Sequence, residues 1–475
     1  MINSKSDGYI GGVSMKYNYD YSQTLWMKLF MAKPDFPNHK SEVYFTFEQA
    51  LDVIKTVDCL TQGIKKIVYL VGWQGLGHDD CYPEMEVVNE FLKRDCDKTA
   101  SESLYWLFEE AKKYNTVVSF HGNVADEYGD NASHREIVEA NAVANGIDGK
   151  PSVIEIFNGR DAYKISYKQY YESGLFKKYF DRFVAATPVR EAGTVHLDNF
   201  CIAESLNPRT DVYDQNDARN KMIDYITSLG IDVTSEYTYR ELPLRADAPD
   251  HPIRRLYSQL GEPLPEESWT HAPIHTLGRI AAAWWLSNLT MEDCMKLSPK
   301  EYCGRFTDRS QLAVFYGALH GEDIWMRCGR DETKWVPEYL REFCLSQLPY
   351  CYLNRYDRVR FEEDDSLGEE RYTVYFSDGV VSKAHGGVIT KNGIAVKEGT
   401  NALLPIDTTD TVFMAYSADG KDGEWNIPDA RFTSADVYEV TASGNRFVKT
   451  VNIVNGKVDL SVKAGGALAI KGKKA

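Results

Sequence analysis

Strand and helix patterns alternate along the first half of this 475-residue chain. Short runs rich in apolar residues predict strands over residues 25–32, 66–71, 116–120, 194–197 and 231–234, and the second of these is rich in β-branched residues. Between these runs, apolar residues recur at helical spacing and predict helices over residues 46–59, 101–114, 167–186 and 216–229, with Ser101 as the N-cap of the second helix. This alternation predicts a parallel sheet.

From residue 355 onward the pattern changes to short alternating runs separated by turn signals. Strand patterns cover residues 372–376, 412–416 and 451–454, and Asn392-Gly393 is a hairpin-turn signal. We therefore predict two domains, a catalytic unit over residues 1–354 and an all-β sandwich over residues 355–475.

The predicted fold class of the first domain is α/β, with a (β/α)8 TIM-type barrel favoured over a doubly wound sheet. Strand–helix units extend over about 350 residues, and polar residues stand just past several predicted strands, as in barrel enzymes. No Gly-x-Gly-x-x-Gly segment follows a predicted strand, which disfavours a dinucleotide-binding fold. Residues 277–289 and 311–319 are apolar, but their pattern does not distinguish strand from helix.

Composition narrows the functional classes. The formal net charge of −16 disfavours nucleic acid as a partner. Aromatic residues make up 12% of the chain, and such rings stack on the apolar faces of sugars, although composition alone favours a tyrosine-rich core with solvated hydroxyls. No apolar run is long enough to cross a membrane. The first residues do not resemble a signal peptide, and nine cysteines lack Cys-x-x-Cys pairs, so we expect a cytoplasmic protein, or a secreted one if a signal peptide has been removed.

Four polar segments follow predicted strands. The first, residues 72–80, reads Gly-Trp-Gln-Gly-Leu-Gly-His-Asp-Asp, and the second, residues 121–128, begins His-Gly-Asn. The third and fourth are residues 196–200 and 235–239. Glycines permit a tight loop close to a ligand, an indole offers a stacking plane, and the polar side chains offer hydrogen bonds. The alternatives are a glycine-rich turn with solvated carboxylates and a loop whose His and Asn satisfy backbone groups.

Asp198 and Glu236 are separated by 38 residues, about the length of one strand–helix–strand unit. We therefore expect them on neighbouring strands, where two carboxylates about 5 to 5.5 Å apart suit a retaining glycosidase. One carboxylate is then the nucleophile and the other the acid/base. The alternative is that both residues cap the helices that follow.

In this order, the four segments resemble the endo-α-N-acetylgalactosaminidases of glycoside hydrolase family 101 and the related family 129 α-N-acetylgalactosaminidases. Residues 72–79 resemble the family's Gly-(Trp/Tyr)-Gln-x-x-Gly-His-Asp loop, and residues 121–127 its segment after the third strand. The resemblance implies a barrel related to α-amylase-like enzymes and retention of configuration, with Asp198 as nucleophile and Glu236 as acid/base. It also implies an α-linked N-acetylhexosamine or galactose in the first subsite, held in part by His78 and Asp79.

The resulting hypothesis is a retaining α-glycoside hydrolase that acts on α-linked N-acetylgalactosamine or galactose in short glycans, with no cofactor and no metal. The residues expected to line the sugar site are Trp73, Gln74, His78, Asp79, His121, Asn123, His196, Tyr237 and Glu322. For Glu322 the alternative, the start of a surface helix, is the favoured one. Two rival functions stay open, namely a carbohydrate-binding protein without activity and a metal-dependent hydrolase on the same barrel, using His78, Asp79, His121 and Asp198.

Overall fold

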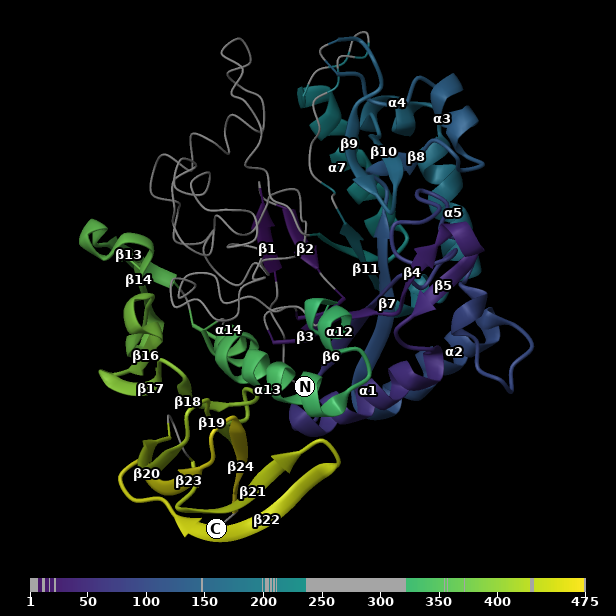
Figure 1. The fold of residues 1–475 in the computed structure, drawn as a ribbon. Helices are drawn as coiled ribbons and strands as arrows, with labels where there is room; N and C mark the ends of the chain where they lie inside the picture. Colours follow the sequence, from purple (N-terminus) through teal and green to yellow (C-terminus); the bar gives the residue numbers. More distant parts are fainter. Residues whose placement is uncertain are drawn as a thin grey trace.

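The fold was obtained as a computed structural model (Figure 1). The structure describes residues 7–10, 13–16, 18–20, 23–146, 148–198, 200, 205, 207, 210, 212–235, 322–353, 355–356, 358–370, 372–427 and 431–473.

Five parallel strands form the sheet that carries the site. Their order across the sheet is β12-β11-β7-β6-β3, and every neighbouring pair is parallel. The strands are β3 (Leu25–Phe30), β6 (Lys66–Val71), β7 (Thr116–Asn123), β11 (Thr194–Asp198) and β12 (Asp232–Ser235). The five strands predicted from the sequence are therefore confirmed, together with their parallel direction and the pairing of the two strands that precede Asp198 and Glu236 along the sheet, β11 and β12.

Helices follow most of these strands as their apolar stripes predict. They are α1 (Phe47–Leu60), α2 (Ala100–Ala111), α4 (Tyr167–Glu172), α5 (Leu175–Ala186), α6 (Val189–Ala192) and α7 (Val212–Ser228). Helix α1 begins with a capping box, in which Thr46 and Gln49 satisfy each other's backbone N–H groups.

Two predicted details of these helices are wrong. Thr99, not Ser101, caps α2, because the Thr99 hydroxyl accepts from the backbone N–H of Glu102 and the helix already begins at Ala100. The single helix predicted over residues 167–186 is two helices, because Gly174 adopts a left-handed conformation with φ of 81° between α4 and α5.

A small antiparallel sheet after β7 was not predicted. Strands β8 (Asp126–Tyr128), β9 (Val153–Phe157) and β10 (Arg160–Lys164) pair in the order β8-β10-β9, with the short helix α3 (His134–Glu139) between β8 and β9. Because β8 begins three residues after β7 ends, this sheet lies at the carboxyl end of the parallel sheet (Figure 1). The hairpin signal Asn158-Gly159, which joins β9 to β10, was present in the sequence.

Other described elements surround the two sheets. The N-terminal and connecting strands are β1 (Asp7–Ile10), β2 (Val13–Lys16), β4 (Ala32–Asp35) and β5 (Lys40–Val43). The helices before the C-terminal domain are α12 (Glu322–Cys328), α13 (Glu332–Glu342) and α14 (Leu348–Leu353), with a π-helical turn over Phe343–Gln347 between the last two.

The C-terminal strands form a ten-stranded sheet and a separate two-stranded ribbon. The large sheet contains β13 (Arg358–Glu363), β14 (Tyr372–Phe376), β15 (Val380–Lys383), β16 (Val388–Lys391), β17 (Ile394–Glu398), β18 (Asn401–Pro405), β19 (Val412–Ser417), β21 (Ser434–Thr441), β22 (Gly444–Asn452) and β24 (Gly466–Gly472). The ribbon pairs β20 (Lys421–Asn426) with β23 (Lys457–Val462). Apolar side chains of the ribbon and of β18, β19, β21 and β24 form one core, so this part is a β-sandwich, as predicted.

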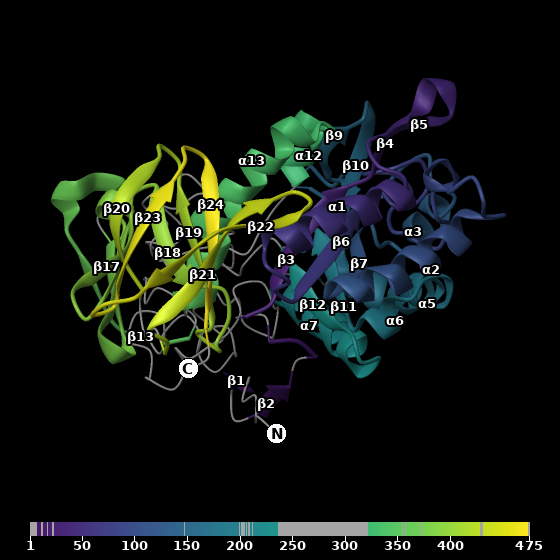
Figure 2. The same ribbon diagram turned by 90° about the horizontal axis from the view of Figure 1, so that it is seen from below.

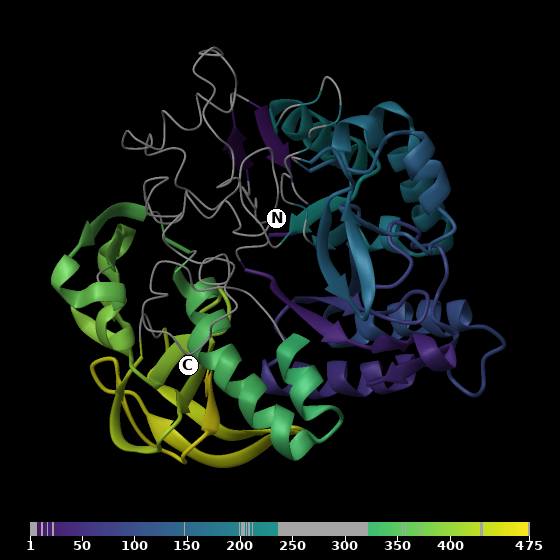
Figure 3. The ribbon, with the colours of Figure 1, turned by 45° about the horizontal axis from the view of Figure 1, so that its top comes forward.

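The sandwich packs against helix α1, which follows the strand β3 region of the parallel sheet. Figure 2 shows β22 beside α1, and the side chains of Gln62, which follows α1, and Asn445 exchange two hydrogen bonds. Helices α12 and α13 lie between the two parts (Figure 3), and the Trp325 indole donates to the backbone carbonyl of Lys28 on β3. The fold is thus mixed α/β with a large β-sandwich domain. Within the described part of the chain, no helix is both long and apolar enough to span a bilayer.

Candidate active site

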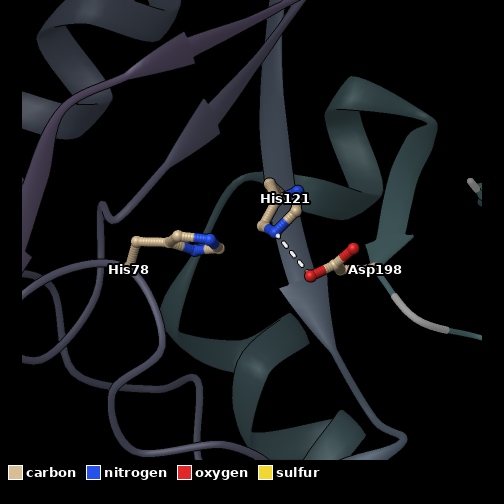
Figure 4. Close-up of side chains that lie close together, drawn as sticks. All are labelled: His78, His121 and Asp198. Atoms are coloured by element: carbon tan, nitrogen blue, oxygen red, sulfur yellow. Dashed lines mark ion pairs between the residues drawn. The ribbon is translucent and has the colours of Figure 1, made fainter. Parts of the chain in front are cut away.

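Three side chains from different segments converge at the carboxyl end of the parallel sheet (Figure 4). They are His78 from the loop after β6, His121 from β7 and Asp198 from the end of β11. His121 Nε2 lies 3.6 Å from Asp198 Oδ2, and the His78 and His121 rings meet edge to face with centroids 5.2 Å apart. We call these three residues the His–His–Asp cluster.

Strand register explains why two members of the cluster meet. Because β7 and β11 are parallel neighbours, His121 pairs with His196, and Asp198 pairs with Asn123 two residues further on. The His121 and His196 rings stack at 5.7 Å, and His196 Nδ1 forms a 2.8 Å hydrogen bond with the Thr234 hydroxyl on β12. His196 is fully buried, so in this structure it supports His121 from behind and does not face solvent.

The third member is held by the glycine-rich loop after β6. Gly72 has a φ of 74°, and a Cβ atom there would overlap the carbonyl oxygen of Ala32. This close approach lets the backbone N–H of His78 donate to the same carbonyl at 2.8 Å. Asp79 adopts a left-handed φ of 58°, which Asp tolerates, and its Oδ2 lies 3.3 Å from His78 Nε2.

Arg160 at the start of β10 ties this loop to the three-stranded sheet. Its guanidinium donates to Asp80 Oδ1 at 3.1 Å and to Asp130 Oδ1 at 2.9 Å, and it stacks over the Tyr128 ring. The other oxygen of Asp80 accepts the backbone N–H of Leu76 at 2.8 Å. Arg160 and Asp80 therefore fix the loop that presents His78 and Asp79.

Two residues of the same loop do not have the open faces expected from the sequence. Trp73 is fully buried, its indole N–H donates to the carbonyl of His121, and its ring packs on Phe120 and Phe183. Gln74 is also fully buried, and its amide points to the backbone carbonyls of Gly77 and Asp80. Because core packing covers the Trp73 ring, it supports the site from beneath in place of the predicted sugar-stacking role.

Asn123 is held in local hydrogen bonds. Its side-chain oxygen accepts from the backbone N–H groups of Ala125 and Asp126, and its amide donates to Asp126 Oδ2 at 2.6 Å. These bonds build the turn from β7 to β8, which is the alternative considered for this loop. Its role in sugar binding stays a prediction.

Three of the predicted residues cannot be placed. Glu236 and Tyr237 lie outside the described residues, although β12 ends at Ser235, directly before Glu236. Strand β12 is the parallel neighbour of β11, as expected from the spacing of Asp198 and Glu236. Glu322 begins helix α12, and its side chain lies outside the described part of the structure.

Two buried tyrosines report the electrostatics of the site. Burial raises the pKa of Tyr82 well above its usual value, and the carboxylates of Asp79 and Asp198 raise it further. The pKa of Tyr128 is also raised, mainly because the phenol is buried and secondly because of the negative charge of Asp79. Both phenols therefore stay protonated and neutral near these carboxylates. Sequence reasoning missed these tyrosines and Arg160, because contacts between residues far apart in the chain carry no local pattern.

The arrangement supports two kinds of chemistry. Asp198, with its side chain 18% exposed, can attack an electrophilic carbon at the mouth of the sheet while the imidazoles orient polar groups of a ligand. Two imidazoles and one carboxylate also form a common ligand set for a transition-metal ion, and their ligand atoms lie within 4.8 Å of one another.

Comparisons with known proteins agree with the resemblance predicted from the four segments. Residues 28–242 match the glycoside hydrolase family 101 model, described as endo-α-N-acetylgalactosaminidase. A provisionally named endo-α-N-acetylgalactosaminidase of Renibacterium salmoninarum is 32% identical over 98 residues, which cover 18% of this chain and 6% of that protein.

Similar solved structures are also glycoside hydrolases. The α-N-acetylgalactosaminidase NagBb from Bifidobacterium bifidum in complex with GalNAc is 13% identical, with a TM-score of 0.49 over 78% of this chain and 58% of that one. An Anoxybacillus α-amylase is 11% identical, with a TM-score of 0.39 over 96% of this chain and 99% of its own. Since this chain spans only a small part of the Renibacterium protein and just over half of NagBb, the activity of the whole protein is a matter of proposal.

Proposed function

We propose, on the premise that residues 28–242 match the endo-α-N-acetylgalactosaminidase family model, that the protein is a retaining α-glycoside hydrolase. Its substrates are short glycans or glycosides with an α-linked N-acetylgalactosamine or galactose residue. The observation that carries the proposal is the position of Asp198. It is the last residue of β11, and its carboxylate lies in one cluster with His121 and His78, all within the residues that match the family model.

Two carboxylates divide the work in this proposal. Asp198 attacks the anomeric carbon and forms a glycosyl-enzyme, while Glu236 protonates the leaving oxygen. Glu236 then removes a proton from the water that releases the sugar. Support for Glu236 comes from the end of β12, which stops one residue before it and lies next to β11.

We also propose that the parallel sheet closes into a (β/α)8 barrel. The five described strands are all parallel and are joined in sequence order from β3 to β12, which is how a barrel begins. A barrel presents its strand ends to a common mouth, so Asp198 and the His78 loop would then face one substrate.

Azide rescue tests the assignment of Glu236. Nitrophenyl α-glycosides of N-acetylgalactosamine, galactose and glucose, with their β-anomers, identify the sugar hydrolysed by the wild type. On the best nitrophenyl glycoside, Glu236→Ala should form the glycosyl-enzyme and then stall, because the good leaving group needs no acid but water still needs a base. Azide should restore turnover and give a glycosyl azide with the configuration of the substrate.

The control for this experiment is Glu204, another carboxylate between Asp198 and Glu236 in the chain. Glu204→Ala should show no azide rescue. Rescue of Glu204→Ala but not of Glu236→Ala would mean that the acid/base is assigned wrongly, and sugar binding without turnover in the wild type would favour the non-catalytic alternative.

A metal-dependent hydrolase is the second candidate function, favoured by the His–His–Asp cluster. It predicts that a chelator abolishes turnover and that an added transition metal restores it. The two-carboxylate mechanism predicts that chelator-treated enzyme keeps full activity.

We further propose that the chain divides near residue 355. Helix α14 ends at Leu353 and β13 begins at Arg358, and residues 364–367 are exposed. Limited proteolysis should cut first between residues 355 and 370, whereas a first cut between residues 100 and 240 would contradict this boundary.

A further inference from the structure

The His–His–Asp cluster has a donor set that a two-carboxylate glycosidase does not require. Such an enzyme needs one nucleophile and one acid/base, yet two imidazoles stand beside the proposed nucleophile. Zn²⁺ and similar transition-metal ions prefer this combination of imidazole nitrogen and carboxylate oxygen.

The distances suit a tetrahedral ion. Bonds of about 2.0–2.1 Å place neighbouring ligand atoms about 3.3 Å apart around a tetrahedral Zn²⁺. His121 Nε2 and Asp198 Oδ2 are already 3.6 Å apart, and the third ligand atom, from His78, lies within 4.8 Å of both. The His78 ring points toward His121 (Figure 4), so small rotations of the His78 side chain would bring all three ligand atoms to the spacing that a tetrahedral ion requires.

A carboxylate outside the cluster orients His78 for this role. His78 Nε2 faces Asp79 Oδ2 at 3.3 Å, while His78 Nδ1 is buried without a hydrogen-bond partner among the described residues. When a metal-binding imidazole ligates through one nitrogen, its other N–H usually donates to a carboxylate or a carbonyl. Ligation through His78 Nδ1 would leave the Nε2–H group facing Asp79 in that position, and Arg160 and Asp80 hold the loop in place.

The burial of the three side chains also favours the binding of a metal ion. His121 is only 1% exposed and stacks on the buried His196, so the position of one ligand is fixed before an ion arrives. The side chains of His78 and Asp198 are 18% exposed, so the cluster can be reached from solvent.

We propose that this cluster binds Zn²⁺ or a similar transition-metal ion in competition with the sugar, and so acts as an inhibitory site. A bound ion takes the oxygen of Asp198 that must attack the anomeric carbon, so metal and substrate exclude each other. The competition rests on the proposed function, whereas the metal site itself rests only on the geometry of the three side chains.

Isothermal titration of chelator-treated protein with ZnCl₂ measures the site without any turnover. The wild type should bind one ion per chain, and Co²⁺ should give the visible absorption of a tetrahedral site. Ca²⁺ and Mg²⁺ should not compete, because they prefer oxygen ligands. His78→Ala should weaken Zn²⁺ binding more than about 100-fold, and Asp79→Asn about 10-fold, as expected for a ligand and for the group that orients it.

His134→Ala is the matched control. His134 also pairs with a carboxylate, that of Glu127, but lies outside the cluster, so this variant should bind Zn²⁺ like the wild type. His78→Gln serves as a second variant if His78→Ala unfolds, since it keeps a polar side chain of similar size. Equal Zn²⁺ affinity in the wild type and in a folded His78 variant would overturn the metal site.

Competition is then tested with sugar and with substrate. Free N-acetylgalactosamine or galactose, whichever the glycoside screen selects, should weaken Zn²⁺ binding, and Zn²⁺ should raise KM without changing kcat. Unchanged Zn²⁺ affinity at saturating sugar, or activation by Zn²⁺, would overturn the competition, and activation would favour the metal-dependent hydrolase. A wild type without activity on any glycoside refutes the proposed function, while Zn²⁺ binding that depends on His78 still supports the metal site.

Discussion

The parallel sheet and the C-terminal sandwich bury their strands in different ways. Strand β6 is buried along its whole length, whereas β23 alternates exposed and buried residues. Apolar side chains of several strands pack around Phe413 in the sandwich, whereas the ends of β7 and β11 bury His121 and His196. Buried polar side chains at a strand end cost free energy unless they are paired, so their position indicates function in the first region.

The sandwich has its own exception, which sharpens the comparison. Lys397 on β17 is 5% exposed, and its ammonium group donates to the backbone carbonyls of Gly387 and Gly399. Carbonyl partners satisfy the donors without supplying a negative charge. Buried polarity in the sandwich therefore serves structure, whereas near the parallel sheet it accompanies a carboxylate that solvent can reach.

The largest expected effect is in the first region. Asp198→Asn replaces the attacking carboxylate by a neutral amide of the same shape, so kcat/KM should fall by about 10⁴-fold or more while the melting temperature changes little. Steady-state kinetics on the best nitrophenyl glycoside and thermal melting measure both quantities. The same exchange at the exposed sandwich residue Asp459 should change neither. Normal turnover by Asp198→Asn would show that the carboxylate at the end of β11 has no catalytic role, so the proposed functional difference between the two regions would be wrong.

For Phe413→Ala in the sandwich we expect the opposite result, a loss of stability without a loss of kcat. Phe413 is fully buried between the ribbon and the large sheet, so the substitution should lower the free energy of unfolding by about 3–5 kcal/mol. Denaturant titration measures this loss, and the protein that remains folded should keep its kcat. Phe447→Ala, at a side chain 56% exposed on β22, should cost less than about 0.5 kcal/mol. A lower kcat in folded Phe413→Ala would show that the sandwich contributes to catalysis.

The buried Lys397 of the sandwich should make the free energy of unfolding depend on pH. Burial lowers the pKa of Lys397 to about 8 from its usual 10.5. Below pH 8 the group is charged in both the folded and the unfolded state, so its burial cost is fully present. Between these two pH values the unfolded chain binds the proton and the folded chain does not, so the free energy of unfolding rises with pH, by about 3 kcal/mol in all.

Denaturant titrations from pH 7 to pH 10 check this effect. Relative to the wild type, Lys397→Met should lose the rise, whereas the exposed control Lys449→Met should keep it. Parallel curves for the wild type and Lys397→Met would mean that Lys397 stays charged in the folded state.

The smallest expected effect concerns the loop clamp. Arg160→Met removes the bonds to Asp80 and Asp130 and loosens the loop that holds His78, so KM should rise about 3- to 10-fold with a smaller change in kcat. Added guanidinium should partly restore KM, which a purely structural loss of stability would not allow. The exposed Arg135→Met in the same small sheet region is the control. Identical kinetics for both variants would show that the clamp does not position the loop.

Much of the strand order was predictable because parallel strands have a strong local signal. Buried strands read as continuous apolar runs, and helices of regular length between them fix which strands become neighbours. The pairing of β11 with β12 followed from the spacing of Asp198 and Glu236, and the hairpin at Asn392-Gly393 followed from its residues alone, since both adopt positive φ in the structure.

Other features had weak or competing signals. Thr99 and Ser101 are both good capping residues, and only the start of the apolar stripe at Ala100 decides between them. The three-stranded sheet after β7 has short strands with mixed polarity, so apart from the Asn158-Gly159 turn its sequence carries no clear strand pattern. Trp73 shows the same limit, because a Trp in a glycine-rich loop can stack on a ligand or fill the core.

The sequence by itself determined the parallel strands, the change to β-structure near residue 355 and the family resemblance over the matched region. Those properties depend on residues close together in the chain, where periodicity and turn chemistry act. Only the tertiary structure decided that His78, His121 and Asp198 meet, that Arg160 clamps the loop and that Trp73 lies beneath it. Such contacts join residues up to 120 positions apart, and their geometry is set by strand register and core packing, which no local pattern records.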